Sequence, residues 1–359
     1  MTNILIVHQN INPTAGGAYT LQAEILNEVS SCNTEGINLF TAPASIINRE
    51  IAVQVEKNFH INLVWYLFPL KTKHLFDVPY IATIWDLGHR SFPVFPELTV
   101  SGWTFENRDE AYRGLLSAFR IFVGSENLKG QLISAYGFER NRIIVNPFPA
   151  PNLPLPNESI KKRIESESLT QSRILFYPAQ FWAHKNHVNL VKALQILETT
   201  KGTNGLIYEL HLTGSDQGNE SFIRDQARSL GLNQKIFFHG FVDQAEISSL
   251  YDRAFALTYP SLLGPDNLPP LEAMSRGCPV ATADIEGARE VYGDSALYFD
   301  PLDAVDIANK IRSLESEKLR LLIIENGRDL AASRSSKKHV EIILNEIKLF
   351  RRYRELYPA

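Results

Sequence analysis

Residues 255–283 read FALTYPSLLGPDNLPPLEAMSRGCPVATA, and this stretch decides the fold of the chain. Residues 255–259 form a short apolar run with aromatic and β-branched members, which is typical of a buried parallel strand. Residues 264–267 break that pattern, and Asn267 is placed to cap a helix whose first turn tolerates proline. A second apolar run follows at 279–283. The order strand, loop, helix, strand predicts an α/β domain with a parallel sheet.

The loop before this helix is a natural place for a phosphate group. The backbone N–H groups of Asn267 and Leu268 lie at the start of the helix, where they have no partner within it. Glu272 follows about one turn later, within reach of sugar hydroxyls. The alternative is an ordinary α/β crossover whose glutamate only complements the helix dipole. The residues alone leave both interpretations open.

Three matches in register give this stretch a family resemblance. Pro260-Ser261, Leu268-Pro269 and Glu272-Ala273-Met274 resemble the signature of glycosyltransferase family 4, which belongs to the group 1 transferases. That family usually reads Pro-Ser-x-x-Glu-Gly-Phe-Gly-Leu-Pro-x-x-Glu-Ala-Met. Here Gly264 stands where the family has the first glutamate of its Glu-x7-Glu pair, and Pro265-Asp266-Asn267 replaces Gly-Phe-Gly. The chain therefore looks like a divergent subgroup.

The resemblance implies a particular domain organisation. Family 4 enzymes have the GT-B fold, an α/β fold of two Rossmann-like domains with a central cleft and a C-terminal helix that crosses back. The five prolines of residues 146–157 predict a linker, and the charged residues 158–167 predict a surface helix after it. We expect an N-terminal, acceptor-side domain over 1–165 that includes a helix at 340–359, and a nucleotide-sugar domain over 166–339.

Composition narrows the cellular setting and the partners. The net charge of −4 gives no case for nucleic acid, and the two cysteines offer neither a disulfide framework nor a metal cluster. Residues 1–10 lack the basic segment of a signal peptide, and no stretch approaches the ~20 apolar residues of a membrane span. We expect a cytoplasmic protein. The basic end at 351–354 is either a solvated helix end or a peripheral contact with the inner face of the membrane.

A glycine pair follows the first apolar run of the chain. Residues 4–7 predict a buried strand, and Gly16 and Gly17 precede a helical pattern. Glycines let backbone amides approach a diphosphate closely, although a Gly-Gly pair is also an ordinary turn. In family 4 a glycine-rich loop at this place faces the nucleotide, so the resemblance makes both glycines donor-site candidates.

Polar and aromatic residues follow a later strand at 80–84. Asp86 and His89 belong to a segment that resembles the His-Asp-Leu region of the family, with Trp85 where that histidine stands. We expect His89 to contact the donor sugar or the acceptor, and Asp86 to orient a neighbour. The alternative is a loop stabilised by an Asx-type turn, with His89 solvated.

The strand at 174–177 leads into a second candidate phosphate contact. The family usually has Gly-Arg-x-x-x-x-Lys here, where the arginine and lysine clamp the diphosphate. Lys185 matches the lysine, whereas Gln180 occupies the arginine position and offers only a neutral hydrogen bond. A cation near a helix N-terminus is disfavoured by the dipole unless an anion is present, and this supports a functional role for Lys185.

Further donor contacts follow the next two strands. Gly214 lies in the loop after the strand at 208–212, and Phe241 and Val242 follow the strand at 236–239. In relatives the corresponding Gly-x-Val segment presents backbone groups to the base. The alternative for Phe241 and Val242 is ordinary core packing.

The resemblance to family 4 implies a retaining hexosyltransferase. The expected donor is UDP-glucose or another UDP-hexose, with GDP-mannose as the alternative, and the acceptor is a saccharide or lipid-linked saccharide in polysaccharide or glycolipid synthesis. Lys185 and the helix N-terminus would stabilise the leaving diphosphate, so no metal and no cofactor should be needed. Asp266 is the candidate to replace the missing glutamate at the sugar. A non-catalytic nucleotide-sugar-binding protein remains a rival class, because the first glutamate and the arginine are missing.

Overall fold

The computed structural model divides into two compact units. Unit 1 comprises Met1–Phe148 and Ser336–Ala359, and unit 2 comprises Pro149–Ser335. The first boundary thus falls within the proline-rich segment, earlier than the expected residue 165, and the second at 335 instead of 339. The structure describes these residues: 1–13, 16–32, 34–68, 74–99, 104–153, 159–160, 162, 165, 170–200 and 205–357. The expected surface helix at 158–167 lies mostly outside them.

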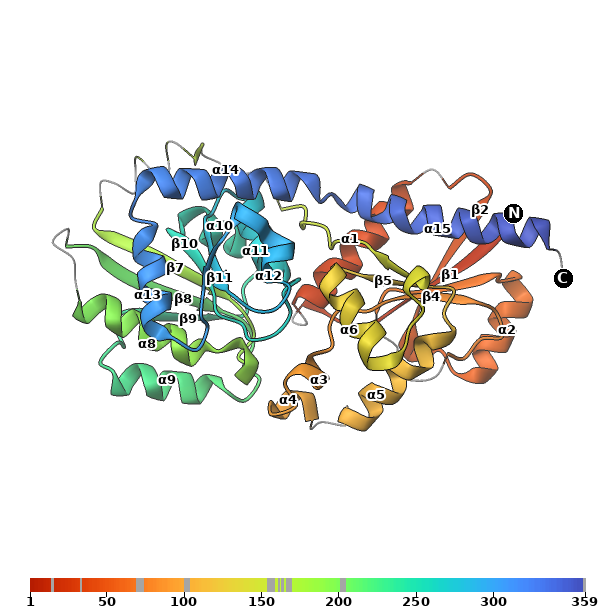
Figure 1. Cartoon of the computed structure of the whole chain (residues 1–359), viewed down its shortest axis with the longest axis horizontal. Coiled ribbons are helices and arrows are strands. Elements are labelled where there is room, and N and C mark those ends of the chain that lie inside the picture. The colour runs from red at the N-terminus through yellow and green to blue at the C-terminus, as the bar shows by residue number, and fades with distance from the viewer. Residues whose placement is uncertain are drawn as a thin grey trace. The chain divides into compact units, whose positions relative to one another are not determined.

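Unit 1 is built on a six-stranded parallel sheet with the order β2-β1-β3-β4-β5-β6. Figure 1 labels β1, β2, β4 and β5 of this sheet. Its central strands are short and buried throughout, as expected for apolar segments covered on both faces. The strands are β1 Thr2–His8, β2 Ile37–Pro43, β3 Leu63–Tyr66, β4 Tyr80–Thr83, β5 Arg120–Val123 and β6 Ile143–Val145.

The helices of unit 1 connect these strands, and the last helix of the chain joins them. They are α1 Gly17–Ser31, α2 Arg49–Phe59, α3 Gly88–Ser91, α4 Pro96–Thr99, α5 Phe105–Gly114, α6 Glu126–Tyr136 and α15 Ser336–Leu356. Helix α15 buries Ile343 and Ile347 within unit 1, and Glu346 forms an ion pair with Arg120 of β5 at 2.6 Å. The C-terminal helix therefore returns to the unit that holds the N-terminus, as the sequence predicts.

Unit 2 also contains a six-stranded parallel sheet, with the order β12-β11-β10-β7-β8-β9. This is the strand order of a Rossmann fold, and its topological switch point lies between β7 and β10. Ligands of such sheets bind beyond the carboxyl ends of the strands at the switch point. The strands are β7 Ser172–Pro178, β8 Ile207–Thr213, β9 Ile236–Gly240, β10 Ala256–Tyr259, β11 Val280–Ala283 and β12 Leu297–Phe299.

The helices of unit 2 alternate with its strands. They are α8 His187–Thr199, α9 Glu220–Ser229, α10 Gln244–Arg253, α11 Leu268–Ser275, α12 Ala288–Tyr292, α13 Ala304–Ser313 and α14 Glu317–Ser333. The expected strand and helix of the stretch at 255–283 are β10 and α11. Within the described parts of the chain, every helix is too short or too polar to cross a membrane.

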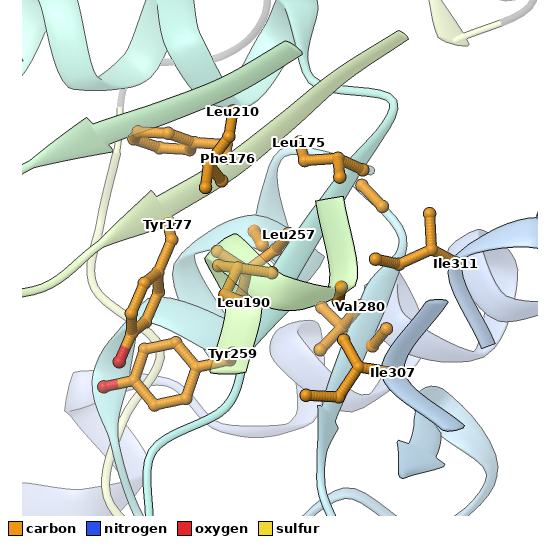
Figure 2. Close-up of a cluster of buried hydrophobic side chains, with 14 of the residues drawn as sticks. Leu175, Phe176, Tyr177, Leu190, Leu210, Leu257, Tyr259, Val280, Ile307 and Ile311 are labelled. Atoms are coloured by element: carbon orange, nitrogen blue, oxygen red, sulfur yellow. The ribbon is translucent and has the colours of Figure 1, made fainter. Parts of the chain in front are cut away.

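The core of unit 2 leads directly to its candidate site. Leu175, Leu190 and Leu257 are fully buried, and each contributes about 1.5–3 kcal/mol by leaving water. Tyr177 and Tyr259 lie in the same cluster, with ring centroids 5.2 Å apart (Figure 2). Their rings belong to the core, while their hydroxyls both form hydrogen bonds with Lys185, in the loop after β7.

Candidate functional site

Two loops meet at the switch point of unit 2. The short 3-10 helix Ala183–Lys185 follows β7, and its His184 carbonyl accepts a hydrogen bond from Leu262 N, which follows β10 (2.9 Å). Asn186 donates from its buried side chain to the Pro260 carbonyl at 3.0 Å. These bonds hold the loop after β7 against the loop after β10.

Lys185 is oriented by three groups at this junction. Its Nζ donates to Asn267 Oδ1 at 3.0 Å and to the Tyr259 hydroxyl at 3.3 Å, while its carbonyl accepts from the Tyr177 hydroxyl at 2.6 Å. The structure thus brings Lys185 and the start of α11 together, as the predicted phosphate site requires. A structure that separated them would have removed the chemical basis of that site.

Asn267 occupies the N-cap position of α11 but does not cap the helix with its side chain. Its Oδ1 accepts from Lys185, and its Nδ2 donates to the Leu263 carbonyl at 2.9 Å. The expected side-chain cap is therefore wrong, because the side chain bridges two loops instead. Leu268 alone among the first three residues of α11 carries an N–H, since residues 269 and 270 are prolines.

Glu272 lies on the buried side of α11 and is 9% exposed. Its Oε2 accepts a hydrogen bond from the Tyr251 hydroxyl at 2.6 Å. Burial raises the pKa of Glu272, and the bond from Tyr251 opposes that rise. The carboxyl group is thus held in one orientation by a residue of α10.

Asp266 precedes the helix and is equally buried, at 9% exposed, but neither of its carboxyl oxygens has a hydrogen-bond partner among the described residues. Burial raises its pKa to about 7, while the nearby Arg334 charge opposes the rise and Glu290 adds to it. A buried polar group without a partner costs about 1–3 kcal/mol, so such groups often mark places where a ligand binds.

Gln180 stands at the arginine position of the family and is held by its neighbours. Its Nε2 donates to Ser215 Oγ at 3.2 Å, and its Oε1 accepts from Trp182 Nε1 at 2.9 Å. These two bonds fix which end of the amide is the donor. Because the side chain is neutral, Lys185 is the cation of the predicted clamp that the structure places at the switch point.

Gly214 lies where the ends of β7 and β8 approach closely. It has a φ of 145°, and a Cβ at this position would lie 2.3 Å from the Ala179 carbonyl oxygen. Only glycine fits here without moving the backbone. Phe241 and Val242 follow β9, and the Phe241 side chain is 52% exposed, so it is not the ordinary core residue of the alternative interpretation.

The glycine pair of unit 1 opens α1, which follows β1. Gly16 is the N-cap with φ 66° and ψ −134°, a conformation that side chains with a Cβ rarely adopt, and Gly17 is the first residue of the helix. Strand β1 borders the place where the strand order of this sheet reverses. The helix that these glycines open thus follows a strand at the switch point of its sheet, and their contact with the donor stays a prediction.

Asp86 and His89 lie beyond the carboxyl end of β4. Asp86 Oδ1 accepts from the Gly88 N–H at 2.7 Å, which is the Asx-type turn that the sequence offered as an alternative. The Asp86 carbonyl also accepts from the Tyr112 hydroxyl at 2.8 Å. Asp86 therefore shapes the start of α3.

His89 is buried, so the alternative interpretation of a solvated histidine is wrong, while the expected contact with the donor sugar or the acceptor stays a prediction. Its side chain is 1% exposed, and its Nε2 lies 3.1 Å from the Tyr136 hydroxyl. Burial lowers the pKa of His89 to about 4, with the Asp86 charge opposing that shift, so the imidazole is neutral at pH 7. In unit 1 this histidine packs against the rings of Phe105 and Tyr112 and forms a hydrogen bond with Tyr136.

Sequence reasoning missed several residues that build these sites. Tyr259 and Asn186 orient the loops of unit 2, and Asp109 and Tyr136 surround His89 in unit 1. Asn186 has a φ of 58°, which is uncommon outside glycine, and asparagine tolerates it better than most residues. The asparagine itself, in a predicted loop, was the available signal for such a turn.

Solved structures of similar fold cover nearly the whole chain. Sucrose-phosphate synthase from Thermosynechococcus elongatus matches with a TM-score of 0.74 over 99% of this chain and 99% of its own, at 17% identity. HepE of Anabaena, in complex with UDP and glucose, matches with a TM-score of 0.72 over 97% of this chain and 100% of its own, at 16% identity. Together with the two parallel sheets, these matches define the GT-B class of α/β fold.

Sequence similarity to known glycosyltransferases adds to the evidence from the fold. Residues 158–330 match the family model described as Glycosyl transferases group 1. O-antigen chain mannosyltransferase RfbU of Salmonella typhimurium is 29% identical over 134 residues, which are 37% of this chain and 36% of the relative. O-antigen chain mannosyltransferase B of Escherichia coli is 26% identical over 220 residues, 60% of this chain and 57% of the relative. This chain thus spans roughly a third to just over half of these relatives, and the matches support a group 1 glycosyltransferase.

Proposed function

We propose that the chain is a retaining hexosyltransferase that moves a hexose from a nucleoside-diphosphate sugar to a saccharide or lipid-linked saccharide. The observation that carries the proposal is the contact between Lys185 Nζ and Asn267 Oδ1 at 3.0 Å. It puts a cation beside a helix N-terminus at the switch point of a Rossmann sheet, where anionic ligands bind.

The chemistry requires stabilisation of one developing charge. As the bond between the anomeric carbon and the diphosphate oxygen breaks, its electron pair goes to the diphosphate. The acceptor oxygen forms the new bond to the anomeric carbon, and its proton passes to the departing diphosphate oxygen. Lys185 and the N–H of Leu268 are placed to bind the leaving diphosphate, and preorganised donors of this kind often contribute more to catalysis than any other group.

The remaining assignments concern two carboxyl groups of unit 2. Glu272 binds the ribose hydroxyls, and Asp266 binds a hydroxyl of the transferred sugar in place of the missing glutamate. The unpaired oxygens of Asp266 support this role, since a sugar hydroxyl would supply the hydrogen bond that they lack among the described residues. If an Asp266→Ala variant keeps both donor affinity and turnover, the assignment of Asp266 is wrong.

The donor is a UDP-hexose such as UDP-glucose or, as the second candidate, GDP-mannose. The names of RfbU and mannosyltransferase B favour the mannosyl donor, while the family resemblance of the sequence favoured UDP-glucose. The base would lie against the backbone at Phe241 and Val242. That backbone recognition does not depend on side-chain identity, so direct binding measurements decide between the donors.

A thermal-shift panel of UDP, GDP, ADP and their sugars tests this proposal. A ligand that binds only the folded state raises its stability by about 2.7 kcal/mol at a hundredfold excess over the Kd. We expect UDP or GDP, and its sugar, to raise the melting temperature more than ADP does. If no nucleotide changes the melting temperature, the proposed donor site is wrong.

Donor turnover separates the transferase from a non-catalytic binding protein. Release of UDP or GDP from the sugar nucleotide, measured with EDTA present, is expected because Lys185 and the helix N-terminus supply the positive field that a metal would otherwise supply. Binding without any release of nucleotide would favour the binding protein. Strict dependence on a divalent metal would refute the metal-independent mechanism.

A further inference from the structure

A connected hydrogen-bond network surrounds His89 in unit 1. The Tyr136 hydroxyl donates to Asp109 Oδ1 at 2.9 Å, and Arg90 Nε lies 3.0 Å from the Tyr136 oxygen and 2.8 Å from Asp109 Oδ1. Arg113 Nε adds a bond to Asp109 Oδ2 at 2.9 Å. His89 Nε2 joins the network through the Tyr136 oxygen at 3.1 Å.

The network fixes which nitrogen of His89 carries the proton. Tyr136 has one hydroxyl hydrogen, and a bond to the ionised Asp109 carboxylate is stronger than a bond to a neutral imidazole. The Tyr136 oxygen therefore acts as an acceptor toward His89, so His89 Nε2 must donate. In a neutral imidazole the other nitrogen, Nδ1, then carries the lone pair.

That lone pair has no donor in the described part of the chain. His89 is only 1% exposed, and its buried Nδ1 has no hydrogen-bond partner there. Phe105 and Tyr112 pack against the ring, with centroids 5.5 and 5.2 Å away, so the ring has little room to flip. The charges that act on the ring are those of Asp86, which belongs to the same loop, and of Arg108, Asp109 and Arg90.

We propose that Asp109 and Tyr136 are positioning residues that hold His89 with Nδ1 as a hydrogen-bond acceptor for a saccharide hydroxyl. This inference rests on the proposed transferase function and specifies the chemistry of His89 within it. The saccharide hydroxyl donates its hydrogen to Nδ1, and no covalent bond forms or breaks at the imidazole. The hydroxyl belongs either to the donor sugar or to the acceptor.

Nitrogen-15 NMR of the full chain with labelled histidine tests the tautomer directly. In the protein without ligand, we expect Nε2 of His89 to be protonated and Nδ1 to be unprotonated. Tyr136→Phe removes the oxygen that accepts from Nε2, so we expect a mixture of tautomers and about a tenfold loss in the rate of donor hydrolysis. A protonated Nδ1 in the unmodified protein would overturn the proposal.

Tyr112→Phe is the matched control. It removes a hydroxyl from the same aromatic cluster, since Tyr112 and Tyr136 stack with centroids 6.0 Å apart, but that hydroxyl bonds the Asp86 carbonyl and not His89. We expect the control to lose stability and keep the His89 tautomer. If both variants lose the same stability and neither changes the tautomer, the network has only a structural role and the proposal fails.

Titration identifies the source of the hydroxyl. A change of the Nδ1 resonance with UDP-glucose or GDP-mannose, but not with UDP or GDP, assigns a donor-sugar hydroxyl. A change that appears only when methyl α-mannoside is added in the presence of UDP or GDP assigns an acceptor hydroxyl. No change with any of these probes overturns the proposal for His89.

The two proposals fail in different ways. If the nucleotides raise the melting temperature but Nδ1 does not respond to any sugar, the inference about His89 fails and the transferase assignment stands. If no nucleotide raises the melting temperature, the transferase assignment fails, whatever tautomer His89 adopts.

Discussion

Two aspartates that are largely shielded from water, one in each unit, behave in opposite ways: the Asp109 side chain is 14% exposed and Asp266 is 9% exposed. Burial pushes the pKa of Asp109 upward, but hydrogen bonds from Arg90, Tyr136 and Arg113 outweigh it, and the pKa is lowered. Asp266 has no such donors among the described residues, so burial raises its pKa to about 7. Burial alone therefore does not decide the charge of a carboxyl group; the number of donors that face it does.

The contrast separates a structural carboxylate from a candidate ligand-binding one. Unit 1 uses Asp109 to fix side chains around His89, and its hydrogen-bonding capacity is used within the protein. The described part of unit 2 leaves both oxygens of Asp266 unpaired beside the helix that Lys185 contacts. An unpaired carboxyl costs stability, and a site that binds a polyhydroxylated ligand recovers that cost when the ligand is bound.

The largest expected effect follows from the assignment of the chemistry to unit 2. Lys185→Ala removes the cation beside the start of α11, and we expect donor turnover to fall by about 10²–10³, the usual effect of losing one preorganised donor. Release of nucleotide from the donor measures it. Lys192→Ala, on the exposed side of α8, is the control and should change turnover less than about twofold. Equal losses in both variants would contradict the assignment.

Asp266→Asn tests the raised pKa. As pH rises above about 4, the unfolded chain loses the proton of Asp266 before the folded chain does, so the wild-type protein loses stability up to about pH 7 and no further. The asparagine variant lacks this loss of stability. The loss amounts to about 1.4 kcal/mol for each unit by which the pKa of Asp266 in the folded state exceeds that in the unfolded state. We expect the variant to gain stability over the wild type from about pH 4 to about pH 8 while it loses donor turnover. Urea unfolding at the two pH values measures the first effect.

Asp109→Asn should change the free energy of unfolding in the opposite direction, as a loss of stability. The folded pKa of Asp109 is lowered, so its stabilisation is present above the unfolded pKa near 4 and is lost as pH falls through the folded pKa. We expect a loss of about 2 kcal/mol at pH 7 that shrinks as pH falls below about 4, because the partly buried bonds to Arg90 and Tyr136 are charge-assisted. Urea unfolding across this pH range measures it. Asp225→Asn breaks an exposed pair with Arg228 and should cost under about 0.5 kcal/mol.

Tyr251→Phe gives the smallest expected effect. It removes the hydroxyl that donates to Glu272, and we expect a loss of about 1 kcal/mol in unfolding free energy and weaker nucleotide binding. Tyr208→Phe removes a similar tyrosine–glutamate bond, to Glu315, at a position that no donor assignment uses. It should match the stability loss and leave the nucleotide-induced thermal shift unchanged. A reduced thermal shift in both variants would contradict the assignment of Glu272 to donor binding.

The sequence predicted the fold well because local patterns specify it. Apolar runs at residues 4–7, 174–177 and 255–259 became the strands β1, β7 and β10, and the breaks between them became the loops of the candidate sites. The approach of Lys185 to Asn267 was predictable because both follow strands that the family resemblance places side by side.

Side-chain orientations could not be predicted, since they depend on contacts between distant residues. His89 is buried against Tyr136, which lies 47 residues further along the chain, and nothing in the local sequence indicates that contact. Asn267 has the right residue type for a cap, but the amine of Lys185 competes for its oxygen. The empty hydrogen-bonding capacity of Asp266 likewise appears only once its neighbours are placed.

The return of α15 to unit 1 also bears on how the protein is made. Unit 2 is one continuous segment, Pro149–Ser335, inserted between two parts of unit 1. During translation unit 2 can therefore complete its fold while unit 1 still waits for the helix at Ser336–Leu356, which supplies Ile343 and Ile347 to its core. A nascent chain interrupted near its end would carry a finished second unit and an incomplete first one, with apolar surface left open to chaperones.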